Sequence, residues 1–158
     1  MTPPAPVGRS AFLLGFAGLL PQVGAVVLLA TSRGDTIMDA VLHGRAAAMA
    51  SYYAAAILSF LGGMWWGFAM RRDAGQGRLV AVAVLPSLIA VALLVAGEAF
   101  WPMRGVLAGL GIAIVATLPV DRHLVATGEA PANWMQLRLP LSVGLVGLTI
   151  IAAIFAGR

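Results

Sequence analysis

Five long apolar runs occupy most of this 158-residue chain and constrain its fold more than any other feature. They cover residues 10–31, 46–70, 79–97, 103–120 and 139–157, with short polar segments between them. A transmembrane helix needs about 20 apolar residues to cross the hydrocarbon core of a bilayer. Irregular backbone is not satisfied in hydrocarbon, so such runs are expected to be helical. The sequence therefore predicts one membrane domain over residues 1–158, an all-α integral membrane protein built as a bundle of five transmembrane helices.

The composition supports the bilayer as the main solvent of the chain. Apolar residues make up 61% of the sequence, charged residues 10%, and the mean hydropathy is +0.96. These values lie outside the range of soluble domains. The ten basic residues are all arginines, and they stand singly or in pairs between the apolar runs. That pattern is typical of membrane-helix flanks and not of a nucleic-acid-binding face, so no nucleic-acid partner is expected.

The distribution of arginines predicts the direction of insertion. Five spans place the two termini on opposite sides of the membrane. If the connections alternate, six arginines fall on the side of the N-terminus and four on the other; the six are Arg9, Arg71, Arg72, Arg78, Arg122 and Arg138. Cytoplasmic segments carry an excess of arginine and lysine. We therefore expect the N-terminus in the cytoplasm and the C-terminus on the opposite side.

Two stripes of small residues predict surfaces for close helix packing. Lipid tails are as apolar as leucine, so membrane helices gain most where small residues let their backbones approach. The second run repeats a small residue every four positions, at Ser51, Ala55, Ser59, Gly63 and Gly67. The fourth run has a similar stripe at Gly105, Gly109, Ala113 and Thr117. We expect these faces to contact other helices, of this chain or of a partner, although a chain rich in glycine and alanine also produces such spacing by chance.

Polar residues near the middles of three runs form a second candidate site. Gln22, Ser59 and Ser87 lie there, and prolines precede two of them. Broken helices around central polar groups bind the substrates of some transporters. The alternative is that each side chain hydrogen-bonds a neighbouring carbonyl. No acidic, basic or histidine residue falls in the interior of the five runs, which counts against a pump or an ion-coupled transporter.

Aromatic residues and one arginine at the ends of the runs are predicted to anchor the helices at the membrane surface, where tryptophan is enriched. These interface anchors are Trp65, Trp66, Trp101, Trp134 and Arg138.

Motifs for catalysis or metal binding are missing. The chain has no cysteine, and its two histidines, His43 and His123, belong to connections on opposite sides of the predicted membrane. No phosphate-binding loop, zinc-protease pattern or nucleophile elbow occurs. We expect no metal, no cofactor and no enzymatic activity.

Three segments resemble a family of small, uncharacterised multi-pass membrane proteins. They are ILSFLGGMWWGFAM at residues 57–70, LPSLIA at 85–90 and PANWMQLRLPLS at 131–142. The family carries a domain-of-unknown-function label, is widespread in proteobacteria and has an animal relative assigned to mitochondrial membranes. The resemblance implies an inner-membrane location and this architecture, and no mechanism. The family often has a histidine or another polar residue in place of Trp65 and a tyrosine in place of Met135, so this chain lacks two titratable groups.

The leading hypothesis is an accessory, assembly or scaffold component of the inner (plasma) membrane that acts through contacts with other membrane helices. One alternative is a transporter or channel for a small neutral solute at Gln22, Ser59 and Ser87. Another is a lipid-binding membrane protein that uses the region of Trp134 and Arg138.

Overall fold

The computed structural model describes residues 5–32 and 35–157, which form seven helices. In chain order these are α1 (Arg9–Ala17), α2 (Leu20–Thr31), α3 (Ile37–Ala69), α4 (Gln76–Ala99), α5 (Met103–Ala116), α6 (Leu118–Ala126) and α7 (Trp134–Phe155). Helices α1 and α2 follow one another along one span, and so do α5 and α6, which gives five stretches long and apolar enough to cross a membrane. The predicted all-α bundle is confirmed, and the protein is a multi-pass membrane protein.

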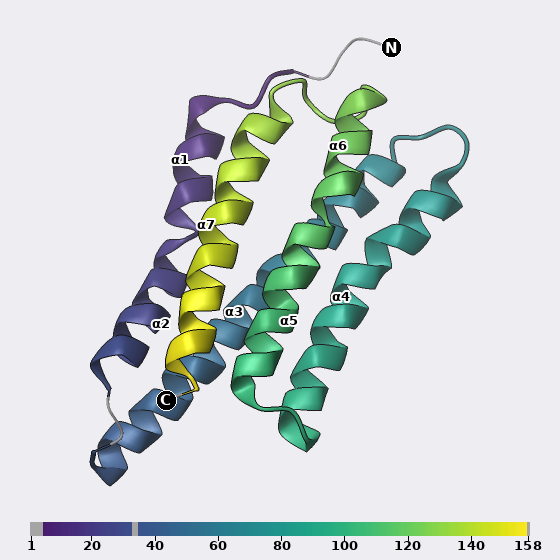
Figure 1. Cartoon of the computed structure of the whole chain (residues 1–158). Coiled ribbons are helices and arrows are strands. Elements are labelled where there is room, and N and C mark those ends of the chain that lie inside the picture. Colours follow the sequence, from purple (N-terminus) through teal and green to yellow (C-terminus); the bar gives the residue numbers. More distant parts are fainter. Residues whose placement is uncertain (1–4, 33–34, 158) are drawn as a thin grey trace.

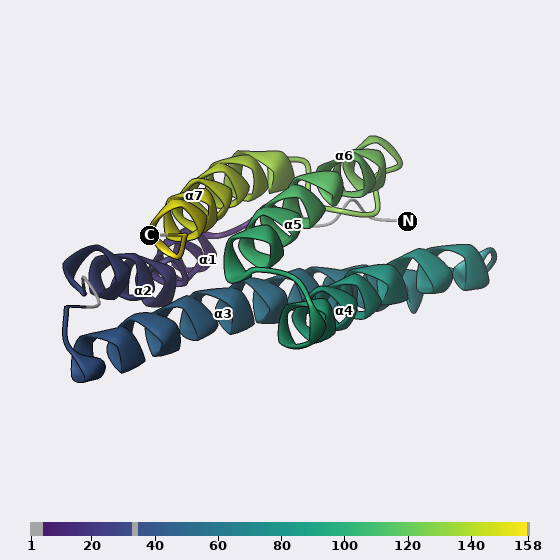
Figure 2. The same cartoon turned by 60° about the horizontal axis from the view of Figure 1, so that its bottom comes forward.

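Helix α3 is the central element of the bundle. It packs against α2, α4, α5 and α7. Figure 1 shows it crossing behind the other helices, and Figure 2 shows α3 and α4 side by side beneath α5, α6 and α7. Its 33 residues make a helix about 50 Å long at 1.5 Å per residue, more than the roughly 30 Å of a hydrocarbon core. The first turns of α3 consequently project beyond the bundle at one end (Figure 1).

Helices α3 and α4 approach each other closely at Gly62. A Cβ atom added there would lie 2.3 Å from the carbonyl oxygen of Ala83. Gly62 and Ala83 are both buried, as is Pro86 one turn further along α4. Only a glycine allows the two backbones to approach this far, which is the packing mode expected for membrane helices.

The first span is broken between α1 and α2, close to Pro21, the proline that precedes Gln22 in the sequence. Pro21 has no N–H to donate to the preceding turn. The hydroxyl group of Tyr53, on α3, donates to the carbonyl oxygen of Gly18 at this break. One alternative from the sequence was that Gln22 hydrogen-bonds a neighbouring carbonyl; its Nε2 instead donates to Thr149 on α7, and Tyr53 reaches the break because α3 passes beside it.

Three spans extend by more than one helical turn beyond the limits expected from the sequence. The fourth span continues through α6 to Ala126, and the fifth begins at Trp134. Pro119, near the end of the run predicted at 103–120, lies in the first turn of α6, where the missing N–H costs nothing. The second span was predicted over residues 46–70, but helix α3 already begins at Ile37. Asp121 and Arg138 consequently lie within membrane-spanning helices.

The described N-terminal segment and the C-terminal end of α7 lie at opposite ends of the bundle (Figure 1). The end of α3, the whole of α6 and the start of α7 lie at the same end as the start of α1. The polar groups of the candidate site gather at this end.

Candidate functional site

An ion pair is buried where α6 and α7 pack together. Nε of Arg138 donates to Oδ2 of Asp121 at 2.7 Å. Asp121 is 0% exposed and Arg138 is 5% exposed. Charged residues in membrane-spanning helices are costly, and they are found paired and facing the bundle interior. This pair fits that rule.

The remaining polar atoms of the pair are held by four neighbouring side chains. Oδ1 of Asp121 accepts from the indole Nε1 of Trp65 at 2.9 Å, and from Nε1 of Trp134 at a longer 3.4 Å. Nη1 of Arg138 donates to Oγ of Ser142 at 2.5 Å, and Nη2 donates to Oγ1 of Thr117 at 2.7 Å. We call these six residues the buried network: Trp65, Thr117, Asp121, Trp134, Arg138 and Ser142. Its groups hydrogen-bond one another, which is the condition under which a buried ion pair is tolerated.

Regular helical spacing brings the network together. Trp134, Arg138 and Ser142 follow at intervals of four along α7, and residues four apart share one face of a helix. Thr117 and Asp121 are also four apart, across the junction of α5 and α6. Asp121 lies in the first turn of α6, where backbone N–H groups favour a negative charge. Two helix faces, each readable in the sequence, thus meet in one cluster.

A second ion pair lies just outside the spans, at the same end of the bundle. Nε and Nη2 of Arg72 donate to the two carboxylate oxygens of Glu129 at 2.5 Å and 2.7 Å. Each side chain is 23% exposed. Hydrogen bonding from Arg72 lowers the pKa of Glu129 below its usual range, and the same bond raises the pKa of Arg72. This pair ties the end of α3 to the turn after α6.

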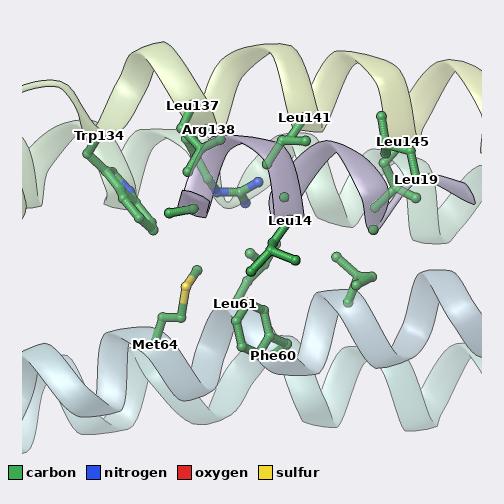
Figure 3. A pocket seen from close by; sticks show the side chains of 14 residues that line it. Leu14, Leu19, Phe60, Leu61, Met64, Trp134, Leu137, Arg138, Leu141 and Leu145 are labelled. Atoms are coloured by element: carbon green, nitrogen blue, oxygen red, sulfur yellow. The ribbon is translucent and has the colours of Figure 1, made fainter. Parts of the chain in front are cut away.

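An apolar groove of about 450 Å³ lies between α1, α3 and α7, beside the buried network. In Figure 3, Leu14 of α1, Phe60 of α3 and Leu141 of α7 surround the space, with Trp134 and Arg138 toward one end. Leu14 is 74% exposed and Phe60 is 62% exposed. The groove therefore opens on the side of the bundle, where lipid surrounds a membrane protein.

The residues predicted to pack helices fall into two groups in the structure. Ser51 and Ala55 are buried, and Ser59 is half-buried. Gly63 and Gly67 are exposed, and no atom lies within 4 Å of a Cβ built at either one. The contact within the chain falls instead on Gly62, one position away from the stripe. The stripe rotates around α3 along its length, so that its second half turns away from α4.

The stripe of the fourth run lies inside the bundle. Gly105, Gly109 and Ala113 are half-buried, and Thr117 is buried. A Cβ at Gly109 would lie 2.8 Å from Cδ2 of Leu93 on α4. This side of α5 accordingly packs against α4.

The three polar residues from the middles of the spans do not form a hydrogen-bonded cluster among the residues that the structure describes. Gln22 is buried, and its Nε2 donates to Oγ1 of Thr149 on α7 at 3.1 Å. Ser59 and Ser87 are half-buried, on α3 and α4. The hydrogen bond to Thr149 directs Gln22 toward α7, and α2 and α4 each pack against α3.

The predicted interface anchors also divide. Trp66 and Trp101 are exposed, as expected of side chains that reach headgroups. Trp65 is 2% exposed and Arg138 is 5% exposed, so both side chains are buried inside the bundle and do not face the surrounding lipid. Trp134 is half-buried and meets the ring of Phe68 edge to face. Asp121 was not among the predicted site residues, because it lies just beyond the run predicted at 103–120.

Comparison with known proteins places the whole fold in one family. A family model with the description "Protein of unknown function (DUF3429)" matches residues 7–155. The chain belongs to this family. The match covers all seven helices and both sides of the buried network of this DUF3429 member. No match was found among curated proteins or among solved structures.

Proposed function

We propose that this DUF3429 protein is an accessory component of the inner (plasma) membrane that binds a lipid in the groove between α1, α3 and α7, without enzymatic activity. The observation that carries the proposal is the groove itself. Its volume of about 450 Å³ lies in the range of small-ligand sites. Its lining is almost entirely apolar, and its opening faces the bilayer.

The composition of the lining favours a hydrocarbon chain over a polar solute. Fourteen residues line the groove, and Arg138 is the only one with a charged side chain. Burial of each methylene group contributes about 0.8 kcal/mol relative to water, but a ligand drawn from the bilayer gains mainly by shape and by polar contacts, as membrane helices do. We therefore infer that the specificity of the site resides at its polar end, near Trp134 and Arg138.

The arrangement of the bundle supports a cytoplasmic location for this end. Arg9, Arg71 and Arg122 are exposed there, and cytoplasmic faces carry an excess of arginine. The N-terminus would then lie in the cytoplasm and the C-terminus on the other side.

Two matched substitutions on α1 test lipid binding. Ala11 and Ala17 are both exposed, but only Ala11 lines the groove. Ala11→Phe would fill the groove, whereas Ala17→Phe would add the same ring outside it. We expect native mass spectrometry of the purified protein to detect retained phospholipid on the parent chain and on Ala17→Phe, and much less on Ala11→Phe. Equal retention by all three proteins would contradict the proposal.

A second function, contact with another membrane helix, is favoured by the exposed half of the α3 stripe. Gly63 and Gly67 offer a smooth surface with open space above them, as membrane helix interfaces do. Replacing both by leucine should leave the fold intact and abolish co-purification of a partner or self-association. Unchanged association, measured by crosslinking in membranes, would exclude this surface.

A further inference from the structure

The guanidinium group of Arg138 has more donors than the chain supplies acceptors. A guanidinium carries five N–H groups. Among the described residues, Asp121, Ser142 and Thr117 take one hydrogen bond each, from Nε, Nη1 and Nη2. One N–H on each terminal nitrogen is therefore left over. Such groups are expensive to leave without acceptors away from water.

The leftover donors are near the groove. Arg138 is part of its lining, together with Trp134 and Leu141 (Figure 3). Almost all of the remaining surface of Arg138 is buried, so the groove is the space from which a ligand can reach this side chain.

The charge of the network selects the kind of acceptor. Asp121 already neutralises Arg138 at 2.7 Å. A phosphate or carboxylate placed against Arg138 would add a second negative charge beside a buried aspartate, and that charge would have no counterion. A neutral oxygen atom can accept hydrogen bonds from the two N–H groups without this penalty.

The depth of Arg138 points to one such acceptor. Arg138 is four residues from the start of α7, which is about 6 Å along the helix axis. The span of 22 residues covers about 33 Å, close to the thickness of the hydrocarbon core. Arg138 thus lies near the boundary between hydrocarbon and headgroups. In a glycerolipid, that boundary contains the ester carbonyl groups.

We propose that the groove binds the acyl chain of an ester-linked glycerolipid and that the two leftover N–H groups of Arg138 donate to its ester carbonyl oxygen. This inference rests on the lipid-binding function proposed above and adds the identity of the group that is recognised. The headgroup is not part of the recognition, because it lies beyond the buried network.

A comparison of ester and ether lipids tests the carbonyl contact on the unmodified protein. Phosphatidylcholine with ester-linked oleoyl chains and its ether-linked analogue differ mainly in the carbonyl oxygens. Each would compete with a pyrene-labelled phosphatidylcholine for the purified protein in detergent. Because the ester lipid would gain one or two hydrogen bonds from Arg138, we expect it to compete about fivefold to tenfold better than the ether lipid. A second comparison uses methyl oleate and oleate, and we expect the neutral ester to compete better than the anion.

A double variant assigns the preference to Arg138. In Asp121→Leu combined with Arg138→Met, both charges are removed together, which avoids an uncompensated buried charge. Circular dichroism would verify its fold. We expect this variant to bind ester and ether lipids equally.

Each alternative result has one meaning. Equal competition by ester and ether lipids on the parent protein would overturn the carbonyl contact and leave lipid binding in the groove intact. A preference that persists in the double variant would overturn the role of Arg138, and tighter binding of oleate would overturn the choice of a neutral acceptor. If Ala11→Phe weakens neither lipid, the groove is not the binding site, and the function and this inference both fail.

Discussion

The two ion pairs of this protein share their chemistry and differ in their surroundings. Arg138 and Asp121 lie inside the bundle, 5% and 0% exposed, whereas Arg72 and Glu129 lie beyond the spans with side chains 23% exposed. Water and ions screen the outer pair, and nothing replaces a lost partner in the inner one. The inner pair is therefore expected to control the stability of the fold and the structure of the adjoining groove. The outer pair is expected only to fasten the end of α3 to the turn after α6.

The largest expected effect comes from breaking the inner pair on one side only. Arg138→Met would leave the carboxylate of Asp121 buried without a counterion. We expect a loss of about 3–5 kcal/mol in the free energy of unfolding, measured by far-ultraviolet circular dichroism during denaturation in mixed micelles. The double variant Asp121→Leu with Arg138→Met should be the more stable of the two. If the double variant is as unstable as the single one, the loss of stability does not come from an unpaired buried charge.

A smaller effect is expected from Trp65, which touches only one end of the inner pair. Trp65→Phe keeps an aromatic ring in the core and removes the hydrogen bond to Oδ1 of Asp121. Hydrogen bonds in membrane proteins contribute about 0.6 kcal/mol on average, and those to charged groups more, so we expect a loss of about 1–2 kcal/mol. Trp66→Phe is the matched control, because Trp66 is exposed and should change stability little. Equal losses for the two variants would contradict the inner role of Trp65.

The smallest effect is expected at the outer pair. Arg72→Gln should cost less than about 1 kcal/mol, because partly exposed pairs contribute little. The pKa of Glu129 is lowered in the folded protein, so its contribution is present above the unfolded pKa and is lost as pH falls through the folded pKa. Unfolding measured across this acidic range should therefore show a small pH-dependent stabilisation in the parent protein that Arg72→Gln lacks. The same pH profile in both proteins would contradict this pairing.

The fold was largely predictable, because five apolar runs of bilayer-spanning length leave little choice of architecture. The break near Pro21 was also anticipated, but the residue that satisfies it was not. Tyr53 lies 35 positions from Gly18 in the sequence, and only the packing of α3 against α2 brings the two together.

The buried network was not predicted, for two physical reasons. The fourth span was predicted to end at residue 120, yet a proline such as Pro119 fits the first turn of a helix, and a charge such as that of Asp121 is tolerated inside a span when it is paired. The spacing of Trp134, Arg138 and Ser142 was available in the sequence as one face of a helix. The rotation that turns this face toward Asp121 depends on how the helices pack together.

The groove was beyond prediction, since it exists where α1 packs against α7 and leaves space above Phe60 of α3. Neither apolar runs nor small-residue spacing contain that information. The stripe of small residues indicated that α3 has a packing surface, but it is Gly62, outside the stripe, where an added Cβ would collide with the backbone of α4.

The central claim, that the groove holds a lipid, is tested most directly by photocrosslinking from two adjacent positions of α1. Leu13 and Leu14 are 73% and 74% exposed, and only Leu14 lines the groove. A benzophenone amino acid would replace each in turn, and the purified, detergent-washed protein would be irradiated and analysed by mass spectrometry. If a lipid occupies the groove, a phospholipid adduct is expected at position 14 and little or none at position 13. Equal adducts at both positions, or none at either, would contradict it.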